Sequence, residues 1–143
     1  MIHGIYLNGY KDDIRPCLKI RENVYQNDFH VTETSDEKDK NAVHILLFNT
    51  DQIPAGTVRI TYDMNGDFGL DRLAVLPEYR NDGLADFIMH MAFDKAVVSG
   101  ARRLVSDETD HNPDFFKKYD FKLVDGRLVL DLREYYKNHS CHD

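Results

Sequence analysis

Residues 68–106 read as a strand, a tight turn, a long helix and a second strand, an order that few folds accommodate. An apolar strand is expected from Phe68 to Leu76, and a polar turn then leads to Gly83. From Leu84 to Ser99 the apolar residues recur at helical spacing, and Arg103 to Ser106 forms a short second strand. This order predicts two parallel strands joined by a helical crossover.

The rest of the chain adds elements on both sides of the crossover. Before it we expect strands over Ile2–Leu7, Ala42–Phe48 and Ile53–Tyr62, and a helix capped by Asp12 or Asp13 with Pro16 in its first turn. After it we expect a short helix from Asn112-Pro113, a hairpin over Phe121–Val124 and Leu128–Leu132, and a mobile polar tail over 134–143. The fold class is therefore α+β, with a mixed, mostly antiparallel sheet of about seven strands and helices packed on it, in one domain spanning 1–143.

Composition narrows the classes of partner. The net charge is −7, which repels phosphate backbones and argues against general nucleic acid binding, but favours cationic partners such as amines. There is no apolar run long enough to span a membrane and no signal peptide, so we expect a cytoplasmic protein with no membrane partner. Cys17 and Cys141 are expected to be reduced. We expect no metal site, because His139, Cys141 and His142 lack a fourth spaced ligand.

The turn before the crossover helix has the features of an anion site. The first N–H groups of a helix have no partner inside it and carry partial positive charge. Gly83 would let a diphosphate approach these groups without meeting a Cβ, Ala85 keeps the first turn slim, and Arg80 adds a positive charge. The alternative is a plain strand-to-helix turn with Asp82 as the helix cap and Arg80 in solvent.

This turn also resembles the signature of a known family. Arg80-x-x-Gly83-x-Ala85 is similar to the R/Q-x-x-G-x-G/A motif of the GNAT superfamily of N-acetyltransferases, and residues 73–80 resemble that family's fourth strand and its exit. The order of elements also matches over most of the chain. Residues 21–25, with the acidic loop and strand that follow, are similar to the small ElaA-like subgroup.

The resemblance implies an enzyme that moves an acetyl group from acetyl-CoA to an amine of a small molecule or peptide, by direct attack in a ternary complex. It implies helices on both faces of the sheet and a cofactor arm lying between two splayed parallel strands. The Leu73 N–H would polarise the thioester carbonyl. The resemblance leaves open a homodimer formed through the last strands. Residues expected to contact the cofactor are Leu73, Ala74, Val75, Arg80, Asn81, Asp82, Gly83, Leu84, Ala85, Asn112, Phe115, Phe116 and Lys118.

The sequence departs from the family pattern in the last helix. Many members carry a tyrosine there that protonates the leaving thiolate, and Phe116 takes its place in this chain. Tyr119 has a hydroxyl but lies three residues further on, where a helix points to another side. Three outcomes stay open: Tyr119 substitutes, water protonates the thiolate, or the protein does not catalyse.

Two groups of side chains could accept the proton of an attacking amine. Asp71 lies two residues before Leu73 and, in a regular strand, would share its face. The alternative for Asp71 is an ion pair with Arg59 or Arg72. The second group, Asp107, Glu108 and His111, follows the next strand and could bind a cationic acceptor or act as base, although a polar loop needs no such role.

Two other classes of function remain open from the sequence. The chain could be a coenzyme A-binding regulatory module with weak or no transferase activity, which Phe116 favours. It could also be an interaction domain with no cofactor.

Overall fold

The computed structural model describes residues 1–63, 65–111 and 113–139. Seven strands form one sheet in the order β1–β2–β3–β4–β5–β7–β6, and the β4–β5 pair is parallel whereas all others are antiparallel. The strands are β1 (His3–Asn8), β2 (Val43–Phe48), β3 (Pro54–Thr61), β4 (Asp67–Val75), β5 (Arg103–Ser106), β6 (Lys122–Val124) and β7 (Arg127–Asp131). The helices are α1 (Arg15–Phe29), η1 (Glu37–Asn41), η2 (Pro77–Tyr79), α2 (Leu84–Val98), α3 (Pro113–Lys117) and α4 (Leu132–His139).

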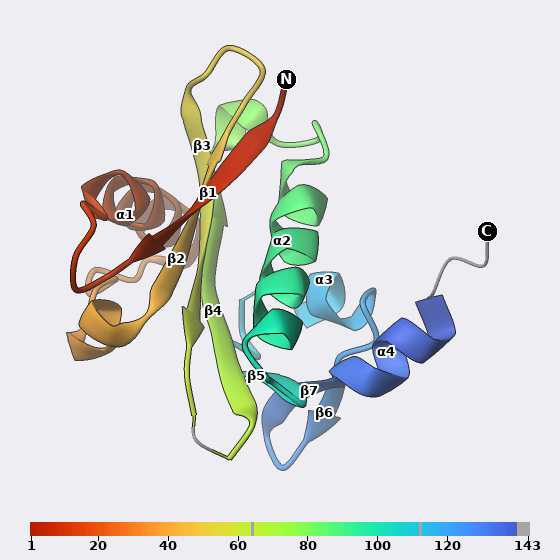
Figure 1. Ribbon diagram of the computed structural model, residues 1–143. Coiled ribbons are helices and arrows are strands. Elements are labelled where there is room, and N and C mark those ends of the chain that lie inside the picture. The colour runs from red at the N-terminus through yellow and green to blue at the C-terminus, as the bar shows by residue number, and fades with distance from the viewer. Residues whose placement is uncertain (64, 112, 140–143) are drawn as a thin grey trace.

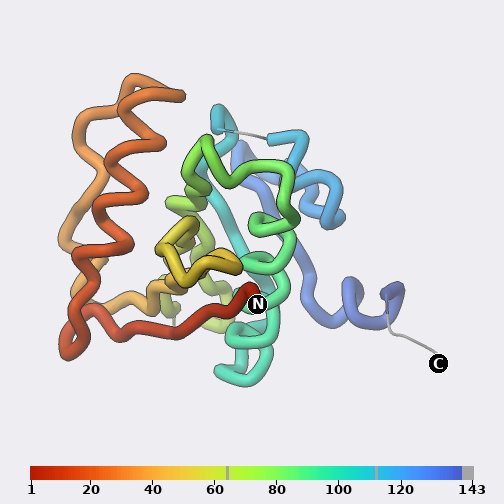
Figure 2. The backbone as a smooth tube through the Cα atoms, turned by 90° about the horizontal axis from the view of Figure 1, so that it is seen from above, coloured from red at the N-terminus to blue at the C-terminus, as the bar shows by residue number. Residues whose placement is uncertain are grey.

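The helices form two layers around the sheet. α1 and η1 lie on one side, and α2, α3 and α4 lie on the other, as the view from above shows (Figure 2). The larger apolar core lies between the sheet and α2, and a smaller one lies between the sheet and α1. Figure 1 shows these two helices on opposite sides of the sheet. The expected fold class and the helical crossover from β4 to β5 through α2 are thus confirmed.

Two local expectations are corrected. Neither Asp12 nor Asp13 caps α1, whose N-cap is Ile14 without a side-chain bond. Asp13 instead binds the exposed side chain of Arg15. Residues 134–139 of the expected polar tail instead belong to α4, which begins at Leu132, ends at His139 and buries Tyr135. The apolar residues of α4 were few, so its helical period was easy to miss in the sequence.

β4 loses its neighbour halfway along its length. It pairs with β5 only at residues 67–69, next to Arg103, Leu104 and Val105, while its pairing with β3 continues to Val75. On the β5 side, the second half of β4 therefore has no neighbouring strand, among the residues that the structure describes, to accept or donate backbone hydrogen bonds. A strand with one free edge inside the molecule provides a slot that an extended ligand can fill.

A β-bulge lies at the point where β4 and β5 separate. Arg72 has a left-handed backbone with φ 58°, and the pairing with β3 shifts by one residue between Thr57 and Arg59. The extra residue reverses the alternation of faces. Asp71 faces Arg59 on the α1 side, whereas Leu73 packs against the core on the α2 side. The expectation that these two side chains share a face is therefore wrong.

Charged side chains are buried beneath α1. Arg21 and Arg59 are 0% and 1% exposed, and both donate to Oδ1 of Asp39, at 2.9 and 3.1 Å. Burial alone would raise the pKa of Asp39, but the charges of Arg21 and Arg59 and the hydrogen bonds from Arg21 and the Asp36 N–H together outweigh burial, so the pKa is lowered. This network joins α1, η1 and β3 through ion pairs rather than apolar packing.

His44 is part of this network and is neutral. Its Nδ1 lies 3.2 Å from Arg21 Nη2, and because arginine only donates, Nδ1 must accept. The Nε2–H then donates to the Asp39 carbonyl oxygen at 2.9 Å. Burial is the main cause that lowers the pKa of His44.

Stability is expected to fall as the pH decreases below about 6.5, the ordinary pKa of an unfolded histidine. Since the pKa of His44 is lowered in the folded state, the unfolded chain binds the extra proton first, and acid favours unfolding. Between pH 6.5 and 5, urea titrations should show a slope of up to about 1.4 kcal/mol per pH unit. His44→Gln can still accept from Arg21 and donate to Asp39. It should flatten this slope, and an unchanged slope would contradict the assignment.

Candidate functional site

A groove lies along the unpaired half of β4. Its volume is about 250 Å³, and it is bounded by α1 on one side and by α2 and α3 on the other. We call it the β4 groove. Its lining residues are Val24, Asp28, Leu73, Ala74, Val75, Arg80, Ala85 and Phe115.

The turn at the end of the groove presents the N-terminus of α2. Asn81 and Gly83 both have left-handed backbones, with φ 72° and 77°, and Gly83 is the N-cap of the 15-residue helix. A Cβ on Gly83 would meet no atom within 4 Å, so the space beside this residue is open. The N-cap is Gly83 and no side chain of the described residues caps the helix, so the alternative with Asp82 as cap is wrong. The donors of the first turn remain available for an anion, as their geometry requires.

Arg80 is not in open solvent. Its Nε donates to the Val75 carbonyl oxygen at 3.0 Å, and its Nη2 lies 2.7 Å from Asp28 Oδ2. The guanidinium thus lies across the groove, between the end of β4 and the last turn of α1.

The residues expected from the last helix separate into different environments. Phe115 lines the groove, but Phe116 is buried in the core at 1% exposure. The Tyr119 hydroxyl donates to Asp86 of α2, and Tyr119 does not line the groove. Burial and this carboxylate raise the pKa of Tyr119. The Lys118 ammonium lies over the rings of Phe115 and Tyr119.

The other residues expected to contact the cofactor differ in their exposure to solvent. Leu84 is buried in the core beneath the turn, while Asn81 and Asp82 are exposed. Asn112 lies outside the described residues.

A second cavity, of about 300 Å³, lies on the α1 side of the bulge. We call it the acidic pocket because carboxylates outnumber cations in its lining. Its residues are Asp36, Lys38, Arg59, Asp71, Arg72, Asp107, Glu108, Asp110 and His111. All three members of the second group proposed from sequence, Asp107, Glu108 and His111, are therefore in one cavity with Asp71.

Glu108 is held firmly in this pocket. Its Oε1 accepts the Arg72 backbone N–H at 2.7 Å, and both of its oxygens accept from the Tyr25 hydroxyl, at 2.9 and 2.8 Å. Burial, followed by the charge of Glu108, raises the pKa of Tyr25, which keeps the hydroxyl a donor. His111 Nδ1 lies 3.4 Å from Glu108 Oε2, and the ring stacks on Phe29. The other ring nitrogen of His111 takes part in no hydrogen bond among the described residues.

Asp71 forms an ion pair with Arg59, which was the alternative to a role as proton acceptor. Its two oxygens accept from Nε and Nη2 of Arg59 at 2.8 and 2.7 Å. Since both oxygens are engaged, the structure favours Asp71 as an anchor of the buried network.

The contribution of α1 to both cavities has no signal in the sequence. Val24 could be assigned only to an apolar helix face, and nothing marked Asp28 or Tyr25 as parts of a site. Their roles depend on how α1 crosses β4, which is a property of tertiary packing.

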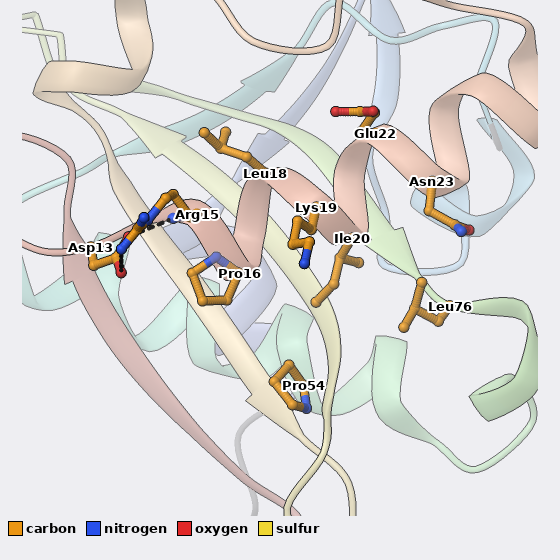
Figure 3. Close-up of a pocket in the computed structure, with 10 residues that line it drawn as sticks. All are labelled: Asp13, Arg15, Pro16, Leu18, Lys19, Ile20, Glu22, Asn23, Pro54 and Leu76. Atoms are coloured by element: carbon orange, nitrogen blue, oxygen red, sulfur yellow. Dashed lines mark hydrogen bonds and ion pairs between the residues drawn. The ribbon is translucent and has the colours of Figure 1, made fainter.

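A larger cavity, of about 870 Å³, lies between the first half of α1 and the residues Pro54, at the start of β3, and Leu76, just after β4. Figure 3 shows Leu18 and Lys19 of α1 on one side and Pro54 on the other, with a single ion pair between Asp13 and Arg15. This cavity borders neither the bulge nor the α2 N-terminus, so we do not assign the chemistry to it.

Within residues 1–63, 65–111 and 113–139, no three metal-binding side chains cluster. No helix in the same ranges is long and apolar enough to cross a membrane.

Comparison with known proteins identifies the family. A family profile described as an acetyltransferase (GNAT) domain matches residues 19–131. No curated protein matches the sequence. The fold is similar to that of an acyl-CoA N-acyltransferase from Pseudomonas aeruginosa, with a TM-score of 0.77 and 14% identity over 90% of this chain and 97% of that chain.

Two other solved structures share the fold. An acetyltransferase of the GNAT family from Staphylococcus aureus Mu50 has a TM-score of 0.76 and 14% identity over 92% of this chain and 99% of that one. Escherichia coli ElaA has a TM-score of 0.75 and 17% identity over 90% and 97%. These identities show the shared fold alone, whereas the profile covers most of the sequence. The chain therefore belongs to the GNAT acetyltransferase family.

Proposed function

We propose that this protein transfers an acetyl group from acetyl-CoA to a primary amine by direct attack in a ternary complex. The observation that carries the proposal is the position of two consecutive residues at the bulge. Arg72 lines the acidic pocket, and Leu73 lines the β4 groove. Two cavities that meet across one peptide unit can hold a donor and an acceptor in reacting distance, which supplies much of the rate enhancement.

The β4 groove suits the acyl donor. The free edge of β4 offers backbone groups to the pantetheine amides, as an added strand would. The open N-terminus of α2 offers N–H groups to the diphosphate. The Leu73 N–H remains our candidate for stabilising the oxyanion, since the neighbouring Arg72 N–H is already bound to Glu108.

The acidic pocket suits a cationic amine, which must lose a proton before it attacks. We assign the proton acceptor to His111, oriented by Glu108, and the anchoring role to Asp71. The amine nitrogen bonds to the acyl carbon, the carbon–sulfur bond breaks, and His111 takes the amine proton. With Phe116 buried and the Tyr119 hydroxyl bound to Asp86, water protonates the thiolate.

Thiol release from acetyl-CoA, measured over a panel of polyamines, aminoglycosides and lysine peptides, tests the function. At least one amine should give release, and double-reciprocal plots should intersect because both substrates bind before reaction. Parallel lines would indicate a covalent acyl-enzyme and contradict direct attack. Binding of acetyl-CoA without release for any amine would favour the regulatory module, for which the burial of Phe116 is the supporting observation.

His111→Gln is expected to lower kcat/KM at pH 7 roughly tenfold, less than general-base catalysis usually contributes. The loss should shrink toward pH 9, because a larger share of the amine is then already deprotonated. The measurement is the pH profile of kcat/KM for both proteins with the same amine. His90→Gln, on the exposed face of α2, serves as the control. Equal losses at pH 7 and pH 9 would indicate a structural role for His111 and refute the assignment.

A further inference from the structure

The side chain of Arg80 lies where the cofactor is proposed to bind. Val75 lies opposite Gly56 on β3, and the next residue, Leu76, donates to the Ala55 carbonyl oxygen at 2.9 Å. Because neighbouring residues of a strand point their peptide groups to opposite edges, those of Val75 face the groove. The Val75 carbonyl there accepts from Arg80 Nε at 3.0 Å. A strand-like ligand would compete for this carbonyl.

Asp28 holds the other end of the same side chain. Its Oδ2 lies 2.7 Å from Arg80 Nη2, and both residues line the β4 groove from opposite walls. The pair is partly open to solvent, with side-chain exposures of 38% for Arg80 and 30% for Asp28. An ion pair in such a setting is weak enough to exchange with a stronger anion.

The position of Asp28 does not serve the helix that carries it. α1 ends at Phe29, and its last turn contains no basic residue. A carboxylate near a helix C-terminus faces the negative end of the helix dipole, which is unfavourable. The charge of Asp28 is therefore balanced by Arg80, across the groove.

We propose that Asp28 is a built-in competitor for the cofactor diphosphate, holding Arg80 as a latch across the groove until the diphosphate replaces the carboxylate. The inference rests on the proposed function, since it requires acetyl-CoA to bind in this groove. Because the ion pair must break before Arg80 can bind the diphosphate, the affinity for the cofactor is lower than it would be without Asp28. Cofactor binding therefore also releases the last turn of α1 from Arg80. Tyr25 lies three residues before Asp28 on the same helix and holds Glu108 in the acidic pocket, so the state of the latch is linked to the acceptor side.

Calorimetric titration of acetyl-CoA into the Asp28→Asn protein tests the latch. Removing the competing charge is expected to lower Kd about fivefold, the upper range for exposed ion pairs. Asp13→Asn is the matched control, because it removes the same charge from the region of α1 and breaks the exposed Arg15 pair, far from the groove. It should leave Kd unchanged.

A double-mutant comparison shows whether the effect passes through Arg80. In an Arg80→Gln background, Asp28→Asn should give no further tightening, because the latch is already absent. An Asp28→Asn protein with the wild-type Kd, or with equal tightening in both backgrounds, would overturn the latch while the proposed function stands. A wild-type protein that does not bind acetyl-CoA at all would overturn the proposed function itself, and the latch with it.

Discussion

Replacing Arg59 with methionine is expected to lower the free energy of unfolding by about 3–5 kcal/mol. Arg59 is 1% exposed and donates to Asp71 through two nitrogens and to Asp36 and Asp39 through a third. Burial alone would lower the pKa of Arg59, but its bonds to Asp71 and Asp36 outweigh burial and raise it. Without the guanidinium, three neighbouring carboxylates lose their shared counter-charge in a poorly solvated site.

Urea denaturation at neutral pH measures this loss. Arg59→Lys keeps the positive charge but loses the planar guanidinium that binds two carboxylate oxygens at once. Its free energy of unfolding should lie between those of the wild type and Arg59→Met. Arg15→Met serves as the control, because Arg15 forms an exposed pair, and its curve should overlay the wild type. Adding Asp71→Asn to Arg59→Met should restore part of the stability, because it removes the carboxylate that has lost its two bonds to Arg59 and keeps only the longer pair with Arg72 at 3.8 Å. If Arg59→Met unfolds at the wild-type midpoint, the buried network does not stabilise the fold.

Replacing Gly83 with valine is expected to weaken acetyl-CoA binding roughly a hundredfold, about 2.7 kcal/mol. Gly83 has φ 77°, a conformation that a β-branched residue strongly disfavours, and it begins the helix whose first N–H groups face the proposed diphosphate. Its missing Cβ would point into open space, so the added side chain would occupy room that a ligand needs rather than clash with the protein.

The Gly83→Asn variant distinguishes backbone strain from a side chain that blocks the ligand. Asparagine tolerates the left-handed conformation, so this variant should keep the wild-type melting temperature in the absence of ligand. Its side chain still projects into the open space, and binding measured by calorimetry should be weakened in both variants. A folded Gly83→Val protein with wild-type affinity would exclude the α2 N-terminus as the diphosphate site.

Much of the fold can be predicted from the sequence because the turn residues and the apolar periodicity indicate the same ends for the strands and helices. Pro77, Gly83 and Gly100 mark the ends of β4 and α2, and the Asp125-Gly126 turn places the β6–β7 hairpin. At these positions only a few residue types fit the backbone, so the pattern is informative.

The site is harder to predict where it depends on the β-bulge at Arg72, which no residue in the sequence indicates. Nothing in the sequence around Arg72 indicates a bulge, since arginine is an ordinary strand residue and adopts a left-handed backbone here only because the surroundings impose it. Strict alternation therefore placed Asp71 and Leu73 on one face. The ion pair of Arg80 with Asp28 was also not predictable, because the two residues are separated by 51 intervening positions and meet only after α1 packs on the sheet.

The free edge of β4 has a consequence for how such proteins diverge. A ligand held by peptide groups selects backbone torsions, and most side chains along the edge can be exchanged without removing a contact. A common fold can therefore persist while few residues are shared, as the 14% and 17% identities to the P. aeruginosa and E. coli structures illustrate. Under the proposed function, divergence would be freest at the positions that line the acidic pocket, where new side chains would admit new amines without changing the β4 groove.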